Sequence, residues 1–95
     1  MNHVVLTAGI VEAKALRYTP AGLPALDLRL EHESSVEEAG QDRRVKAVIK
    51  AVALGTLAER LGVQPIGGVF CFTGFLATPR NGKSVVLHVQ DFQQD

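Results

Sequence analysis

Apolar and polar residues alternate along most of this chain, with the period of two that is typical of β-strands. The clearest case is Ala25 to Glu33, whose leucines share one face and whose charged residues share the other. Val4 to Leu16 is predicted to be a longer strand with a bulge or bend at Gly9, because glycine inside a strand pattern marks such a site. Val69 to Ala77 and Val85 to Phe92 are the predicted strands of the C-terminal third. The pattern therefore indicates a protein built mainly from strands.

A fifth predicted strand, Arg44 to Leu54, has one apolar face and one basic face. Arg44, Lys46 and Lys50 have the same parity, so their side chains are expected to point the same way. Such a row is either a plain solvated face or a binding surface for an anionic ligand. Three bases on one strand face favour the binding role.

Only Gly55 to Leu61 predicts a helix, of two turns at most. Thr56 is expected to cap it, with Glu59 three residues later completing a capping box. Five strands with one short helix between the third and the fourth is the element order of an OB-fold. The sequence therefore predicts an all-β, five-stranded OB-fold barrel, with residues 1–95 forming one domain.

The polar segments between the strands predict two turns and one loop. Thr19 to Pro24 contains two prolines and a glycine and is predicted to be a turn. Ser34 to Arg43 is polar and acidic and is predicted to be a long, mobile loop. Thr78 to Lys83 is predicted to connect the last two strands as a hairpin, with Asn81-Gly82 at its turn.

Composition sets limits on the function without naming one. The 95 residues include 10 basic and 10 acidic side chains, so the formal net charge is zero. No apolar run approaches the roughly 20 residues that span a bilayer, and no signal peptide is recognisable. The single cysteine, Cys71, excludes an intrachain disulfide and cannot build a zinc site alone. We expect a cytoplasmic protein without a membrane partner.

The charges are segregated along the chain, which a net charge of zero conceals. Residues 24–42 contain six acids and one base, whereas residues 43–90 contain seven bases and one acid. Segregation of this kind is expected to give a local positive field.

No combination of side chains predicts an enzyme, a metal site or a cofactor. Ala77 to Ser84 resembles a relaxed phosphate-binding loop, but such a loop must open a helix, and here a β-branched strand follows. His3, His32 and His88 lack ligand spacing with Cys71 or with a carboxylate. The two strand histidines are therefore expected to be structural.

The remaining features are basic and aromatic, as in proteins that bind single-stranded nucleic acid with cations on the phosphates and rings stacked on the bases. Phe75 is expected to point outward from its strand, and packing in a dimer interface or at a core edge is the open alternative for it. The predicted site for single-stranded DNA combines the basic strand, the first turn, the last hairpin and this ring: Arg17, Tyr18, Arg44, Lys46, Lys50, Phe75, Arg80 and Lys83.

Two resemblances narrow the class. Ala51 to Leu76 resembles the central block of bacterial single-stranded-DNA-binding proteins, with a Leu-Ala-Glu helix between two strands. Nearly the whole chain is similar to the primosomal replication protein N family, the PriB family of bacterial replication restart. This similarity rests on short pieces in the same order and spacing: Val5-Leu6, Thr19-Pro20-Ala21-Gly22-Leu23-Pro24, Leu30-Glu31-His32, Glu37-Glu38-Ala39-Gly40, Gly74-Phe75, Asn81-Gly82 and Val86-Leu87-His88.

The resemblance implies a homodimer of OB-folds that binds single-stranded DNA at stalled forks, with the restart helicase and other primosome proteins as partners. By position, it implies DNA contacts for Arg17, Lys46, Phe75, Arg80 and Lys83. The chain has no tryptophan, and it has Lys46 where related proteins can offer an aromatic residue. Cations are therefore expected to supply most of the binding.

Two alternatives stay open from the sequence. A protein-interaction OB module with little DNA binding would use its barrel face and the acidic 31–42 region for a partner. A general single-stranded-DNA-binding protein shares the 51–76 block but continues into a long flexible tail with an acidic tip. Because the sequence ends at Gln93-Gln94-Asp95, recruitment through such a tail is not expected.

Overall fold

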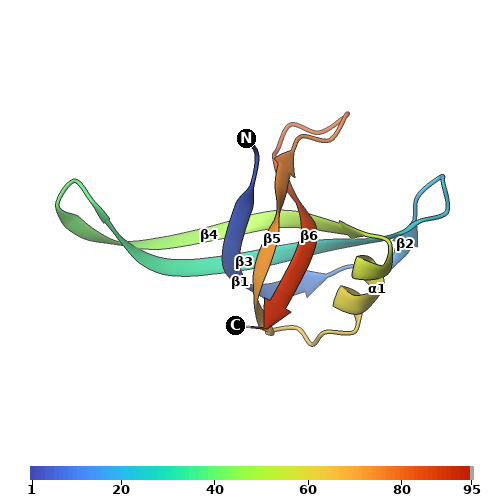
Figure 1. Cartoon of the computed structure of the whole chain (residues 1–95), viewed down its shortest axis with the longest axis horizontal. Helices are drawn as coiled ribbons and strands as arrows, with labels where there is room; N and C mark the ends of the chain where they lie inside the picture. The colour runs from blue at the N-terminus through green and yellow to red at the C-terminus, as the bar shows by residue number, and fades with distance from the viewer. Residues whose placement is uncertain (95) are drawn as a thin grey trace.

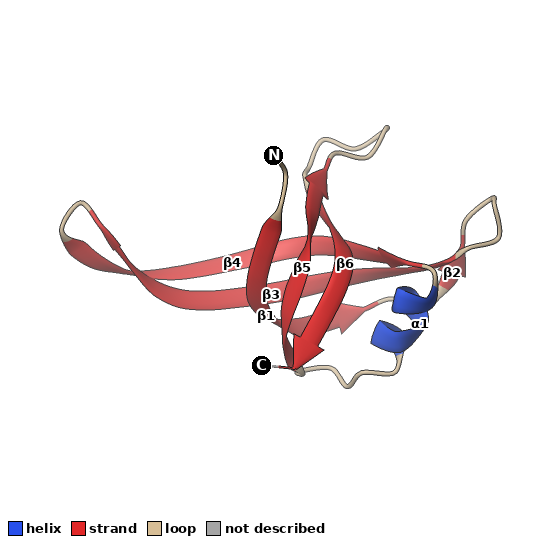
Figure 2. Cartoon of the chain, in the orientation of Figure 1, coloured by secondary structure: helices blue, strands red, loops and turns tan. Residues whose placement is uncertain are grey.

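Strands enclose one hydrophobic core, and a single short helix lies at one end (Figure 1, Figure 2). The computed structural model describes residues 1–94. Asp95, which belongs to the predicted C-terminal end Gln93-Gln94-Asp95, lies outside the described residues. The elements in chain order are β1 (Val4–Ala13), β2 (Arg17–Tyr18), β3 (Pro24–Glu38), β4 (Gln41–Leu54), α1 (Thr56–Gly62), β5 (Val69–Ala77) and β6 (Val86–Gln94).

The bent strand β1 closes the sheet into a barrel. Its first half pairs with β5 and its second half with β3, and Gly9 has a partner in each, Val69 and Glu31. A register shift between Ile10 and Glu12 marks a bulge just past the glycine, where the sequence predicts a bend. The sheet order is β1-β5-β6-β4-β3-β2, with β4 and β6 parallel and the other pairs antiparallel. The predicted five-stranded OB-fold barrel is confirmed, with the two-residue β2 added beside β3.

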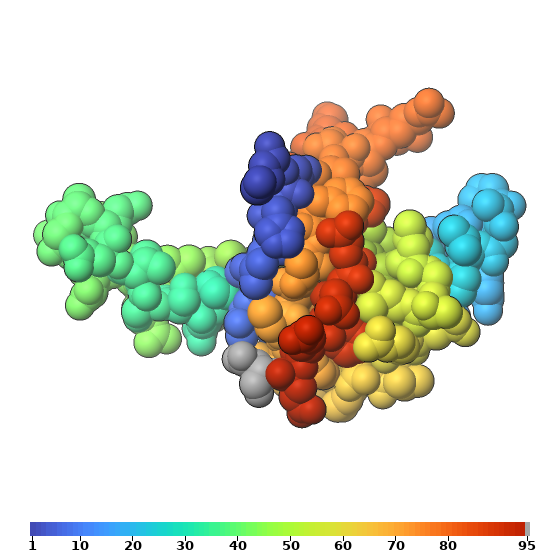
Figure 3. All heavy atoms as spheres, in the orientation of Figure 1, coloured from blue at the N-terminus to red at the C-terminus, as the bar shows by residue number. Residues whose placement is uncertain are grey.

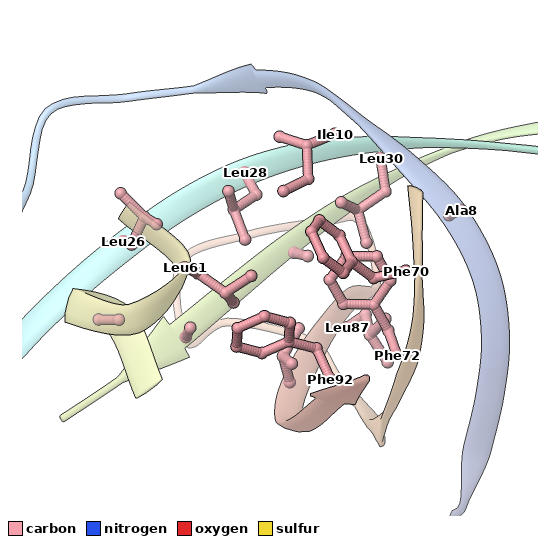
Figure 4. Close-up of a cluster of buried hydrophobic side chains, with 14 residues drawn as sticks. Ala8, Ile10, Leu26, Leu28, Leu30, Leu61, Phe70, Phe72, Leu87 and Phe92 are labelled. Carbon is pink, nitrogen blue, oxygen red and sulfur yellow. The ribbon is translucent and has the colours of Figure 1, made fainter. Parts of the chain in front are cut away.

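Leucines and phenylalanines from the inward faces of the strands fill the barrel (Figure 4). Phe70 packs edge-on against Phe92, with 5.4 Å between ring centroids, and Phe72 is fully buried between neighbouring strands. Leu76 has the same parity as these β5 rings, and the alternation predicts a core position for it. It is instead 41% exposed, although its partner across the sheet, Leu87, is fully buried.

The predicted mobile loop from Ser34 to Arg43 is wrong. β3 and β4 pair without interruption as far as Glu38 and Gln41 and form a long hairpin arm (residues 34–44) that projects from the barrel (Figure 3). Its two turn residues, Ala39 and Gly40, have φ of 52° and 78°, the backbone of a type I′ turn. Residues 35–44 are exposed on both faces of the arm, and all of them except Val36, Ala39 and Gly40 are polar or charged.

The helix also differs in detail from the prediction. Gly55, not Thr56, is the N-cap of α1, and no side chain caps the helix, so the predicted capping box is wrong. Ala58 and Leu61 are buried in the core, so packing stabilises this helix in place of a cap. No helix among residues 1–94 is long and apolar enough to cross a membrane.

The loop between β5 and β6 (residues 78–85, the β5–β6 loop) turns one residue earlier than predicted. The amide of Gly82 donates to the carbonyl of Pro79 at 2.9 Å, so Arg80 and Asn81 are the central residues and Gly82 follows them. Arg80 is consequently presented at the tip of the loop.

Candidate nucleic-acid interface

The bases of β4 form the predicted row on the outside of the barrel. Arg44, Lys46 and Lys50 are all exposed, as is Val48 in the same row, whereas Val45, Ala47 and Ile49 of the other parity are half-buried. The parity assignment is therefore confirmed. What the sequence does not predict is the identity of the residues beside this row.

Acidic side chains of β3 lie directly beside the outer two bases. Lys46 is opposite Glu33 in the register, and its Nζ lies 3.9 Å from Glu33 Oε1 and 3.6 Å from Glu31 Oε1. Arg44 Nη2 lies 3.8 Å from Glu33 Oε1. These are exposed ion pairs worth at most about 1 kcal/mol each, so they offset the positive field without locking the side chains.

Lys50 has a different neighbourhood. Its partner across the sheet is Arg29, and within residues 1–94 no carboxylate lies at ion-pair distance from either base. Lys50 also lines an apolar surface hollow together with Val48, Leu76 and Val85. This hollow places Lys50 of β4 beside the β5–β6 loop.

Arg17 and Tyr18 lie on β2, at the edge of the sheet. Arg17 makes a paired contact with Asp27, its Nε donating to Oδ2 at 2.6 Å and its Nη2 donating to Oδ1 at 3.1 Å. This hydrogen bond lowers the pKa of Asp27 below its ordinary value, with partial burial opposing and the charges of Arg17 and Lys14 assisting. The guanidinium of Arg17 is therefore already engaged, whereas the ring of Tyr18 is 66% exposed.

Arg80 and Lys83 are exposed on the β5–β6 loop. In the described part of the chain neither has an acidic side chain at ion-pair distance. The loop stands away from the barrel in the space-filling view (Figure 3). Two uncompensated cations are thus presented on a projecting loop.

Phe75 is half-buried and stacks on His88, with 4.8 Å between ring centroids and 12° between ring planes. The register joins these residues to the outer face of β4, because His88 is paired with Phe75 on one side and with Val52 on the other. Val52 has the parity of Lys50, so the ring and the base lie on the same face of the sheet, with Val52 itself buried between them. The other strand histidine, His32, is hydrogen-bonded to Thr7 and Ser34, as a structural residue should be.

Known proteins share both the sequence and this fold. A family model described as another single-strand binding protein family matches residues 2–91. The replication restart protein PriB of Bordetella pertussis is 52% identical over 91 residues, which cover 95% of this chain and 85% of the relative. The chain belongs to the PriB family. The resemblance that the short sequence pieces indicate is therefore confirmed.

Solved structures extend the comparison. The protein PriB from Ralstonia solanacearum has a TM-score of 0.90 and 34% identity, over 99% of this chain and 97% of that chain. The wild-type single-stranded DNA binding protein from Thermus aquaticus has a TM-score of 0.78 and 27% identity, over 98% of this chain and 49% of that chain. The PriB fold of this chain is thus shared with a single-strand binding protein.

Two basic residues close to Lys50, Arg29 and Lys14, were not among the predicted site residues. Arg29 is the only base between residues 24 and 42, and Lys14 follows β1. The sequence contains one clue to Arg29: if Ala39-Gly40 is recognised as a two-residue hairpin turn, the register that follows sets Arg29 opposite Lys50. Lys14 has no comparable clue, because its position depends on the bulge in β1.

Proposed function

We propose that this protein binds single-stranded DNA as an accessory protein of replication restart. The observation that supports this most directly is the sheet face shared by Phe75 and Lys50, which adjoins the β5–β6 loop that carries Arg80 and Lys83. Cations and an aromatic ring on one barrel surface suit a polyanion with bases that stack. The role is one of binding rather than catalysis, in the cytoplasm.

The proposed contacts are not equal in strength. Lys50, Arg80 and Lys83 are free of carboxylate partners among residues 1–94, and Tyr18 is exposed at the sheet edge. Arg44 and Lys46 must leave Glu33 and Glu31 to reach phosphate, and Arg17 must leave Asp27. Phe75 contributes either by stacking on a base or by packing against His88, and only the first adds about 1–3 kcal/mol to binding.

A titration of a fluorescent single-stranded oligonucleotide at two salt concentrations tests this function. Because each phosphate that meets a cation releases a counterion, affinity is expected to fall steeply with salt, with a slope of about 0.7 per contact on logarithmic axes. Absence of binding at low salt would overturn the proposal.

The proposed assembly is a homodimer that also contacts the restart helicase and other primosome proteins. The relatives named as replication restart proteins support a role beside such partners. Light scattering should give the mass of two chains, and a single-chain mass would remove the dimer from the proposal.

A protein-interaction module with little DNA binding is the second candidate. It is favoured by the ion-paired surface of the hairpin arm, where Arg43 Nε lies 2.7 Å from Glu38 Oε1, since a surface with both charges paired attracts a polyanion weakly. Capture of the helicase that is unaffected by added DNA, together with negligible oligonucleotide binding, would favour this function over the first.

A further inference from the structure

A second surface hollow lies where β1, β3 and β4 meet. It has a volume of about 160 Å³ and is lined by Glu12, Lys14, Asp27, Leu28, Arg29, Lys50, Ala51 and Val86. Three of these residues are bases and two are acids. One of the acids, Asp27, is already engaged by Arg17, so the hollow has an excess of positive charge.

The strand register brings two of these positive charges close together. Arg29 and Lys50 are directly opposite each other on neighbouring strands, where Cβ atoms are about 5 Å apart. Like charges in such a pair are destabilising unless an anion lies between them. Lys14 approaches from the end of β1, where its amide donates to the carbonyl of Asp27 at 3.0 Å.

The outer part of the β3–β4 hairpin has the opposite arrangement. Arg43, Arg44 and Lys46 each have a glutamate within 4.0 Å, whereas none of Lys14, Arg29 and Lys50 has a carboxylate at that distance within residues 1–94. The bases nearest the barrel are therefore the ones free to bind an anion.

We propose that Lys14, Arg29 and Lys50 form a phosphate-binding site that holds the backbone of single-stranded DNA at the base of the hairpin arm. This inference rests on the proposed function and adds the path of the strand, which runs over the barrel end of β3 and β4, with Arg44 as the one proposed contact on the arm. Glu12, opposite Arg29 in the β1–β3 register, limits the strength of the site because its charge repels phosphate.

The test compares two double variants of equal charge change, K14Q/R29Q and R43Q/R60Q, by oligonucleotide titration at 0.1 M salt. Each lost phosphate contact is worth about fivefold there, given a slope of about 0.7, so K14Q/R29Q should bind about tenfold or more weakly than the unmodified protein. The control should lose less than about threefold. Arg43 lies about 20 Å along the strand from Lys50, beyond the screening length of about 10 Å, and Arg60 lies on α1, outside the proposed surface. E12Q should bind more tightly.

The outcomes separate this inference from the proposed function. If the unmodified protein binds DNA but K14Q/R29Q and R43Q/R60Q weaken binding equally, or E12Q weakens it, the site is wrong and the function stands. If the unmodified protein does not bind at low salt, the proposed function itself fails. All of the substituted residues are exposed, and circular dichroism of each variant verifies the fold.

Discussion

Replacing Gly74 with alanine is expected to lower the free energy of unfolding by about 3 kcal/mol, toward the upper end of overpacking effects. Gly74 is buried in β5 beside β6, where the register shifts, and a Cβ there would meet the backbone carbonyl of His88, with the carbonyl carbon at 2.9 Å. Backbone atoms cannot rotate away as a side chain can, so the two strands must separate. Urea denaturation followed by circular dichroism measures the effect.

Gly9→Ala is the matched control for this substitution. Gly9 also lies inside a strand between two partners, but a Cβ there would have its nearest neighbour, Val69 Cγ2, at 3.7 Å, an ordinary van der Waals contact. Its unfolding free energy should change by less than about 1 kcal/mol. Equal stability of the two variants would contradict the close approach of β5 and β6 at Gly74.

Removing the three uncompensated cations Lys50, Arg80 and Lys83 together, as glutamines, is expected to weaken DNA binding by about 100-fold at 0.1 M salt. Each contact contributes about fivefold at that concentration, and the salt slope should fall by about 2. None of the three has a carboxylate partner among residues 1–94 to lose, so stability should change little. Titration of each protein over a salt series measures both quantities.

The charge-preserving variant K50R/R80K/K83R is the control for that experiment. Binding through phosphate charge tolerates this exchange, so its affinity should stay within a few-fold of the unmodified protein. A glutamine variant that binds as tightly as the unmodified protein would show that the DNA lies elsewhere.

The strands were predictable because burial on one side of a sheet leaves a period of two in the local sequence. The leucines of β3 and the bases of β4 face opposite ways for this reason, and both assignments hold in the structure. The hairpin arm was not predictable in this way, since it is exposed on both faces and has no period. Its turn is also atypical, because Ala39 occupies a positive φ that Asn or Gly usually takes.

The candidate site depended on pairings that lie far apart in the sequence. The acidic and basic segments looked separate along the chain, yet β3 and β4 are antiparallel neighbours, and this sets Glu33 beside Lys46. The stack of Phe75 on His88 likewise depends on the register of β5 with β6, which includes a shift. Composition and spacing indicate which residues are available, whereas strand register decides which of them remain free to bind.

The most direct test of the central claim is where DNA touches the protein. Amide chemical shifts of the ¹⁵N-labelled protein, followed during titration with a short oligothymidine, should change at Lys50, at Val52 and through the β5–β6 loop. The tip of the arm around Ala39-Gly40 and the exposed side of α1 should stay unchanged. Shifts confined to the arm tip or to α1 would contradict a nucleic-acid surface on the barrel.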